Sequence, residues 1–249
     1  MGTLTSSRVS GVSSGKISVV NVSMAMPPPP PMPPMPMPME SPNTGKMKTG
    51  LLVAGIGLIL GAFIGFGGFG FVGTLILAIG GILMLTGAGS YPGAKGTIGA
   101  GFALIMVGFI IGIVAWVMTP SLFLLTPPTD LAAYLNALAT GLLLSFVAGL
   151  LTWIGVIIMP MKVTTGAGKG LAMAGGILGL IGVVLVFVMV YLTVAALVAA
   201  IGGGTPPNFN SILAAIAGLI IGAILGLVGS ILAGVGYIIG RNKLVPATM

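Results

Sequence analysis

The chain has 249 residues, of which 57% are hydrophobic and 4% are charged, and its mean hydropathy is +1.23. Soluble domains carry about 25% charged residues, so this composition excludes a soluble globular protein and indicates a membrane protein. The chain lacks cysteine and histidine. This excludes disulfides, thiolate nucleophiles, zinc sites built on these ligands and the usual proton shuttle.

Residues 1–48 form the first predicted domain, an interior tail that differs in composition from the rest of the chain. The first 25 residues are mostly Ser, Thr, Gly and Val, and we expect them to be disordered or to form one short strand on a partner. Residues 27–39 are all proline or methionine, which favours polyproline II and a semi-rigid spacer of roughly 40 Å. Residues 40–48 make a polar bridge to the first apolar run.

The methionines of the spacer raise the alternative of a copper(I) site, because thioethers are soft metal ligands. The four methionines concerned are Met32, Met35, Met37 and Met39. The stiffness of the prolines and the absence of His and Cys favour a plain spacer or a partner-docking segment. We therefore expect no metal site and no cofactor.

Residues 50–240 contain the apolar runs that predict membrane-spanning helices. The run from 50 to 87 would extend over roughly 50 Å as one helix, whereas the hydrocarbon core is about 30 Å thick. Its middle reads Phe66-Gly-Gly-Phe-Gly70, so we expect two short helices that either cross the bilayer or re-enter it. The predicted spans are 50–66, 70–87, 97–119, 132–159, 171–201 and 210–240.

The predicted fold class is therefore all-α, a polytopic transmembrane helical bundle of about six spans with a disordered Pro-rich N-terminal tail. The spans form three tandem helical hairpins. The hairpins occupy residues 49–95, 96–162 and 163–243, and residues 244–249 are a short C-terminal tail. Three tyrosines and one tryptophan near span ends are expected to be interface anchors: Trp116, Tyr134, Tyr191 and Tyr237.

The distribution of charge predicts the topology. With six spans, all nine Lys and Arg fall on the side that holds both termini. The positive-inside rule makes this side cytoplasmic, or interior, so we expect an integral multi-pass membrane protein with both termini there. The residues expected to set this topology are Lys46, Lys48, Lys95, Lys162, Lys169, Arg241 and Lys243.

The chain also shows signs of an internal repeat. At an offset of 74 residues, Lys95, Gly96, Ala100, Gly101 and Gly108 fall on Lys169, Gly170, Ala174, Gly175 and Gly182. The Thr-Pro-Pro turns that begin at Thr126 and Thr205 precede Lys162 and Arg241 by the same interval. The predicted unit is a basic loop, a helix, an outer loop and a returning helix. Chance matching in a Gly-rich background is the alternative, and the first hairpin fits less well.

Glycines recur at intervals of four residues in four of the predicted spans. Residues four apart share a helix face, and glycine allows two helix backbones to approach closely. These faces can pack helices within one chain or join copies of the chain, and the sequence leaves both alternatives open. The helix-packing candidates are Gly57, Gly61, Gly65, Gly108, Gly112, Gly175, Gly179, Gly218, Gly222 and Gly226.

The predicted spans contain no ionisable acid or base. Such residues mark ion and proton pathways in membranes, so the spans argue against a pump, a proton-coupled transporter or a voltage sensor. No acid, base or activated nucleophile points to an enzyme. We expect a structural or assembly protein, either a membrane-complex subunit or a viral envelope-type component. The alternative is a channel or facilitator for a small neutral solute.

The expected partners follow from these features. The lipid bilayer surrounds the spans, and we expect a homo- or hetero-oligomer within it. The tail is expected to dock a protein partner. Contact of the basic side with nucleic acid is a weaker alternative, because positive charge at span ends is already explained by topology.

Overall fold

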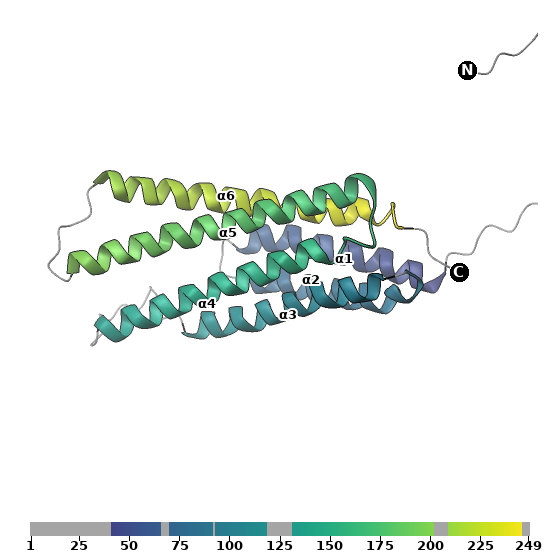
Figure 1. Ribbon diagram of the computed structural model, residues 1–249, viewed down its shortest axis with the longest axis horizontal. Coiled ribbons are helices and arrows are strands. Elements are labelled where there is room, and N and C mark those ends of the chain that lie inside the picture. The colour runs from purple at the N-terminus through teal and green to yellow at the C-terminus, as the bar shows by residue number, and fades with distance from the viewer. Residues whose placement is uncertain (1–40, 66–69, 92, 119–130, 202–208, 246–249) are drawn as a thin grey trace, which may run out of the picture. The chain divides into compact units, whose positions relative to one another are not determined.

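The computed structural model describes residues 41–65, 70–91, 93–118, 131–201 and 209–245. The chain divides into two units, residues 1–39 and 40–249, and every described residue belongs to the second. The predicted disordered tail and its spacer lie outside the described residues. Six helices make up the second unit (Figure 1): α1 (Pro42–Gly65), α2 (Gly70–Gly87), α3 (Ala94–Met118), α4 (Leu131–Ile158), α5 (Gly166–Ile201) and α6 (Phe209–Gly240).

All six helices are long and apolar enough to cross a membrane. This confirms the predicted all-α, polytopic membrane fold. A short 3-10 helix (Ala88–Ser90) follows α2. The described residues contain no β-strand, and their one β-bridge joins Thr164 to Leu244 in antiparallel fashion.

Two helices begin five or more residues earlier than the sequence predicted. α1 begins at Pro42, so residues 42–48, assigned above to the tail, are helical. The Ser41 hydroxyl accepts a 3.3 Å hydrogen bond from the Thr44 N–H, and proline suits the first helical position because its missing N–H would have no partner there. α5 begins at Gly166, which leaves only a short turn between α4 and α5.

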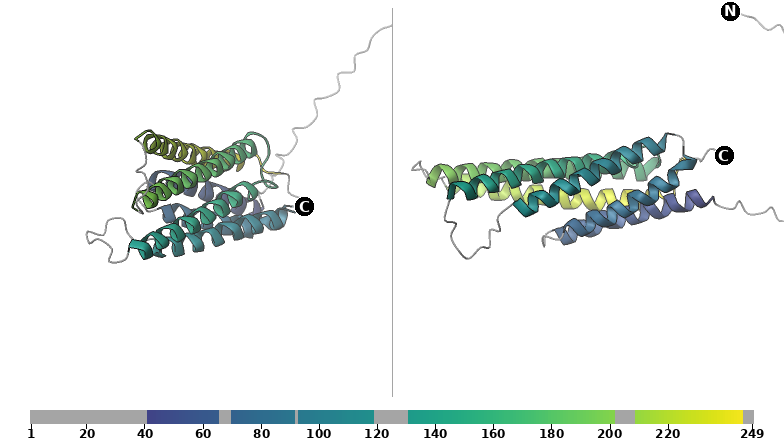
Figure 2. Two further views of the ribbon diagram at one scale, coloured as in Figure 1. Left: turned by 60° about the vertical axis from the view of Figure 1, so that its left-hand side comes forward. Right: turned by 90° about the horizontal axis from the view of Figure 1, so that it is seen from below.

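The six helices close a ring in chain order, because each packs on the next and α6 returns to α1. The views in Figures 1 and 2 show the three hairpins α1–α2, α3–α4 and α5–α6 side by side. The ring closes where Gly55 of α1 meets Gly234 of α6. A Cβ atom added to Gly55 would lie 2.6 Å from the Gly234 carbonyl oxygen, so these two backbones touch.

The hairpins differ in length. α5 has 36 residues and α6 has 32, whereas α2 has only 18. At 1.5 Å per residue, α5 is about 54 Å long and α2 about 27 Å. Figure 1 shows the α1–α2 hairpin ending well short of the α5–α6 hairpin. The ring is therefore complete at one end and lacks two of its helices at the other.

The core fills the complete half of the ring. Its largest fully buried side chains include Met47, Leu51, Met84, Ile98 and Met159. Many large apolar side chains point outward instead, such as those of the exposed Ile110 on α3 and Ile220 on α6. An apolar exterior without charge suits lipid and not water as the surrounding solvent.

Candidate functional site

Glycines that repeat every seven residues hold the α5–α6 hairpin together. They are Gly168, Gly175 and Gly182 on α5 and Gly222, Gly229 and Gly236 on α6. A Cβ atom added to Gly175 would lie 2.6 Å from the carbonyl oxygen of Gly229. One added to Gly236 would lie 2.9 Å from the carbonyl oxygen of Gly168. The two backbones are thus in direct contact, and we call such an interface a glycine seam.

The other two hairpins have seams of the same kind. Their small residues are Gly50 and Gly57 against Gly73, Gly80 and Gly87 in α1–α2, and Gly101 and Gly108 against Ala148 and Gly155 in α3–α4. A Cβ atom on Gly57 would lie 2.6 Å from the Leu77 nitrogen, and one on Gly155 would lie 2.5 Å from the Gly101 carbonyl oxygen. Seven residues make about two helical turns, so residues seven apart stay on one face of two paired helices. Lipid supplies no hydrophobic drive for helix pairing, and close backbone packing replaces it.

Most of the predicted helix-packing glycines pack against another helix of the same chain. Those that face another helix of the same chain are Gly57, Gly61, Gly108, Gly112, Gly175, Gly179, Gly218 and Gly222. Gly65 is the last residue of α1, and its surroundings are outside the described residues. Gly226 differs from the rest, because a Cβ atom added to it would meet no heavy atom within 4 Å. Association of copies through glycine faces remains a prediction.

All seven basic residues of the described part gather at one end of the bundle, where α1, α3 and α5 begin. We call it the basic end and the other the far end. The seven are Lys46, Lys48, Lys95, Lys162, Lys169, Arg241 and Lys243. The acidic residues of the chain, Glu40 and Asp130, are outside the described residues. The described part therefore carries only positive side-chain charge, concentrated at one end.

Two turns at the basic end share one backbone feature. Gly93 before α3 has φ +66° and Gly166 at the start of α5 has φ +62°, values that favour glycine over any residue with a Cβ atom. A lysine lies beside each turn. The Lys162 Nζ atom is 3.7 Å from where a Cβ atom of Gly93 would be, and the Lys243 Cδ atom is 3.6 Å from where one of Gly166 would be. The Thr165 N–H also donates to the Lys243 carbonyl oxygen, which ties the chain after α6 to the start of α5.

A hydrogen bond links α6 to α4 in the core next to the basic end. Tyr237 is fully buried, and its hydroxyl donates a 2.7 Å bond to the Val156 carbonyl oxygen. The prediction that Tyr237 anchors the membrane interface was wrong, since its side chain reaches across the ring. Trp116 and Tyr191, in contrast, are 75% and 59% exposed.

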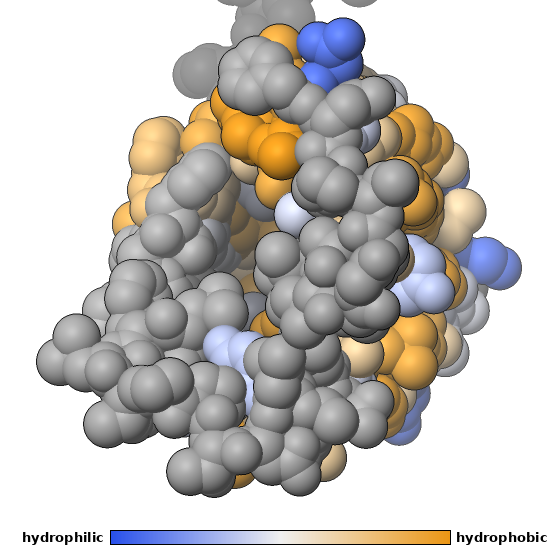
Figure 3. Space-filling model, turned by 90° about the vertical axis from the view of Figure 1, so that its left-hand side faces the viewer, coloured by the Kyte–Doolittle hydropathy of each residue, from blue (hydrophilic) through white to orange (hydrophobic). Residues whose placement is uncertain are grey.

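Three adjoining cavities lie between the closed core and the far end. Their volumes are about 280, 280 and 150 Å³. The first and second share Ala223 and Gly226, and the second and third share Gly61, Trp153 and Ser230. We call the three cavities together the chamber. Figure 3 looks onto the far end of the bundle and shows a hollow in this surface.

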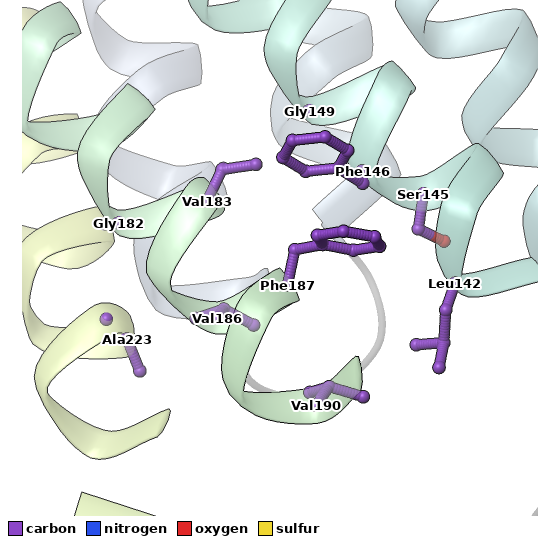
Figure 4. Close-up of a pocket in the computed structure, with 12 residues that line it drawn as sticks. Leu142, Ser145, Phe146, Gly149, Gly182, Val183, Val186, Phe187, Val190 and Ala223 are labelled. Carbon is purple, nitrogen blue, oxygen red and sulfur yellow. The ribbon is translucent and has the colours of Figure 1, made fainter. Parts of the chain in front are cut away.

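The walls of the chamber are mostly carbon. Phe146 of α4 and Phe187 of α5 stack in its wall with ring centroids 4.1 Å apart (Figure 4). Its polar side chains are hydroxyls and the indole of Trp153. Among the hydroxyls, Thr152 donates to the Ala148 carbonyl oxygen of its own helix at 2.9 Å. Sequence analysis missed the chamber, because it arises where the short hairpin stops beside Trp153. In the sequence, only the glycines in predicted spans of unequal length could have indicated such a cavity.

The described residues include no group of His, Cys, Asp or Glu side chains that could hold a metal ion. Their distinctive features are thus three glycine seams, a basic end and an apolar chamber. Scans against protein-family models, curated proteins and solved structures found no match to this chain.

Proposed function

We propose that this chain is a structural protein of a membrane, a scaffold that anchors a partner at its basic end. The observation that carries the proposal is the coincidence of two features at that end. The seven described basic residues gather there, and α1 begins there at Pro42. The 41 preceding residues, with their proline-methionine spacer, therefore join the bundle on its positive side.

The charge pattern also supports an orientation. Lys and Arg concentrate in the cytoplasmic loops of membrane proteins, so the basic end is placed in the cytoplasm or in the interior of an enveloped particle. Both termini then lie on that side, where the tail can reach a protein partner. Nucleic acid is a less favoured partner, because the topology already accounts for this much positive charge.

The close packing of the helices supports a scaffold rather than a transporter whose helices must move. Backbone contact along three seams leaves little room for helices to slide, since the contacts involve main-chain atoms. The core between the chamber and the basic end is closed by large buried side chains such as Met84 and Met159. The shared seven-residue spacing also supports a tandem repeat of one hairpin unit.

Lateral assembly is part of the proposal. The far half of α6 extends beyond the end of α1 and exposes Leu213, Ile216, Ile220 and Ile224. A second copy or another subunit can pack on this face more closely than lipid. Most of the predicted helix-packing glycines face another helix of the same chain, so this apolar flank is the better surface for an oligomer.

The test compares two forms of the protein, each extracted in mild detergent from its own membrane, once without nuclease and once with it. One is the full chain and the other lacks residues 1–41, which precede α1. Native mass spectrometry should find the full chain in a stoichiometric complex and the shortened chain without the partner. Recovery of each form as a lone chain, with no bound partner, would refute the scaffold. Loss of the partner on nuclease treatment alone would identify nucleic acid instead.

A facilitator for a small neutral solute is the second candidate. The observation that favours it is the closed ring of six helices with a chamber open toward the far end. The filled core at the basic end opposes it. Vesicles that contain the purified full chain should be as tight to glycerol and urea as empty vesicles if the scaffold is correct. Faster flux that a chamber-filling variant abolishes would favour the facilitator.

A further inference from the structure

The chamber combines an unusual shape with an unusual chemistry. On α4 its lining residues run from Leu142 to Val156, which is about 21 Å at 1.5 Å per residue. On α5 and α6 the lining extends over about 12 Å each by the same measure, from Gly182 to Val190 and from Gly222 to Ser230. The lining residues thus follow the three helices along their length.

One missing side chain leaves open space in the wall of the chamber. Gly61, Gly149, Gly182 and Gly222 also line it, but a Cβ atom on any of them would meet a neighbouring helix. Gly226 has the most room, because no heavy atom lies within 4 Å of where its Cβ atom would be. Beyond Gly65, where α1 ends, no part of that helix continues the wall beside α6.

Water is a poor occupant of the first cavity, in whose lining the only polar side chain is that of Ser145. A buried water needs two to four polar partners, and the lining carries no charged side chain. Thr152 already donates its hydroxyl hydrogen to its own helix. The stacked rings of Phe146 and Phe187 form a flat apolar wall, and Tyr191 continues the stack toward the far end, with a centroid distance of 6.1 Å to Phe187.

We propose that the chamber binds one hydrocarbon chain of a bilayer lipid that enters from the leaflet at the far end. The chamber lies between membrane-spanning helices and is open at the bundle surface, so it is continuous with the lipid-facing exterior. Hydrocarbon chains are the apolar molecules in excess at this depth. An extended chain matches a slot that follows α4, and burial of its methylene groups against carbon walls replaces contacts with other lipids. The site does not depend on the proposed scaffold function.

The structure supplies a variant that fills the site and a matched control. Gly226→Leu places a side chain in the open space of the chamber without a backbone clash. Gly170→Leu makes the same change at an exposed position of α5, where a Cβ atom also meets no heavy atom within 4 Å. Should Gly226→Leu fail to fold, Ala223→Leu fills the same cavities.

The test uses the purified full chain in phosphatidylcholine nanodiscs with a phosphatidylcholine probe that bears a diazirine near the end of one acyl chain. After illumination, label should concentrate on peptides from 142–149, 182–190 and 222–230, above the level on the exposed face of α3. In Gly226→Leu this excess should disappear, and in Gly170→Leu it should remain. Label that is uniform over all exposed helices, or an excess that Gly226→Leu leaves unchanged, would overturn the proposal.

Discussion

The Tyr237 hydroxyl of α6 donates a 2.7 Å hydrogen bond to the Val156 carbonyl oxygen of α4. In an unbroken helix this oxygen would accept from the N–H four residues later. That position is Pro160, which has no N–H. Tyr237 thus satisfies a carbonyl group that the end of α4 leaves without its usual donor, and it links two hairpins in the closed half of the ring.

We expect Tyr237→Phe to destabilise the bundle, because the buried Val156 carbonyl oxygen then loses its partner. A buried polar group without a partner costs about 1–3 kcal/mol. Thermal unfolding in detergent measures the effect. Tyr191→Phe, at an exposed position, is the matched control and should unfold at the wild-type temperature. Equal unfolding temperatures for Tyr237→Phe and the control would mean that the bond contributes nothing.

The glycine seams predict that replacement of glycine by alanine changes the free energy of unfolding unequally at two positions of α5. A Cβ atom on Gly175 would meet the backbone of α6, including the Gly229 carbonyl oxygen at 2.6 Å, whereas one on Gly170 would meet nothing within 4 Å. Gly175→Ala should therefore cost about 1–3 kcal/mol through overpacking. Gly170→Ala should be neutral or stabilising by up to about 1 kcal/mol. Unfolding in detergent with added denaturant compares them, and similar losses would argue against the seam.

The turn before α5 gives a third prediction. Gly166 has φ +62°, and a residue with a Cβ atom in the left-handed region costs about 1–2 kcal/mol. Gly166→Ala should lower the unfolding temperature, and Gly166→Asn should lower it less, because asparagine tolerates this region better. Gly45→Ala in α1 is the control, since it has neither a positive φ nor a close neighbour. A loss at Gly45 as large as at Gly166 would contradict this explanation.

The topology can be tested by single cysteines, because the natural chain has none. Cysteine at Gly96 or in place of Lys243 should react with a membrane-impermeant maleimide only from the cytoplasmic side. Cysteine in place of Asn210, the second residue of α6, should react only from the other side. Reaction of the Lys243 and Asn210 variants from the same side would contradict six full spans with both termini together.

Composition, apolar run length and the position of glycine and proline were enough to predict six helices and their pairing in hairpins. The start of α1 was missed, although Ser41-Pro42 is a helix-start signal, because the lysines that follow suggested a polar linker. The four-residue spacing predicted glycines that mostly face a neighbouring helix, but it included only four of the seam glycines: Gly57, Gly108, Gly175 and Gly222. It overlooked the seven-residue interval, as between Gly168 and Gly175, that describes two helices in contact along their length.

Other features depend on contacts between segments far apart in the chain. Closure of the ring requires Gly55 to meet Gly234, and no local pattern specifies that pair. The partner of Tyr237 likewise depends on where α4 ends relative to α6. The chamber follows from the level at which the α1–α2 hairpin stops beside Trp153, which is set by packing and not by span length alone.

The native mass of the protein from its own membrane tests the scaffold most directly. The account predicts that the full chain is recovered in a complex of fixed stoichiometry, well above the 24.7 kDa of one chain, and that removal of residues 1–41 releases the partner while the bundle stays folded. Recovery of the full chain as a lone 24.7 kDa species, unchanged in its associations by loss of the tail, would contradict it.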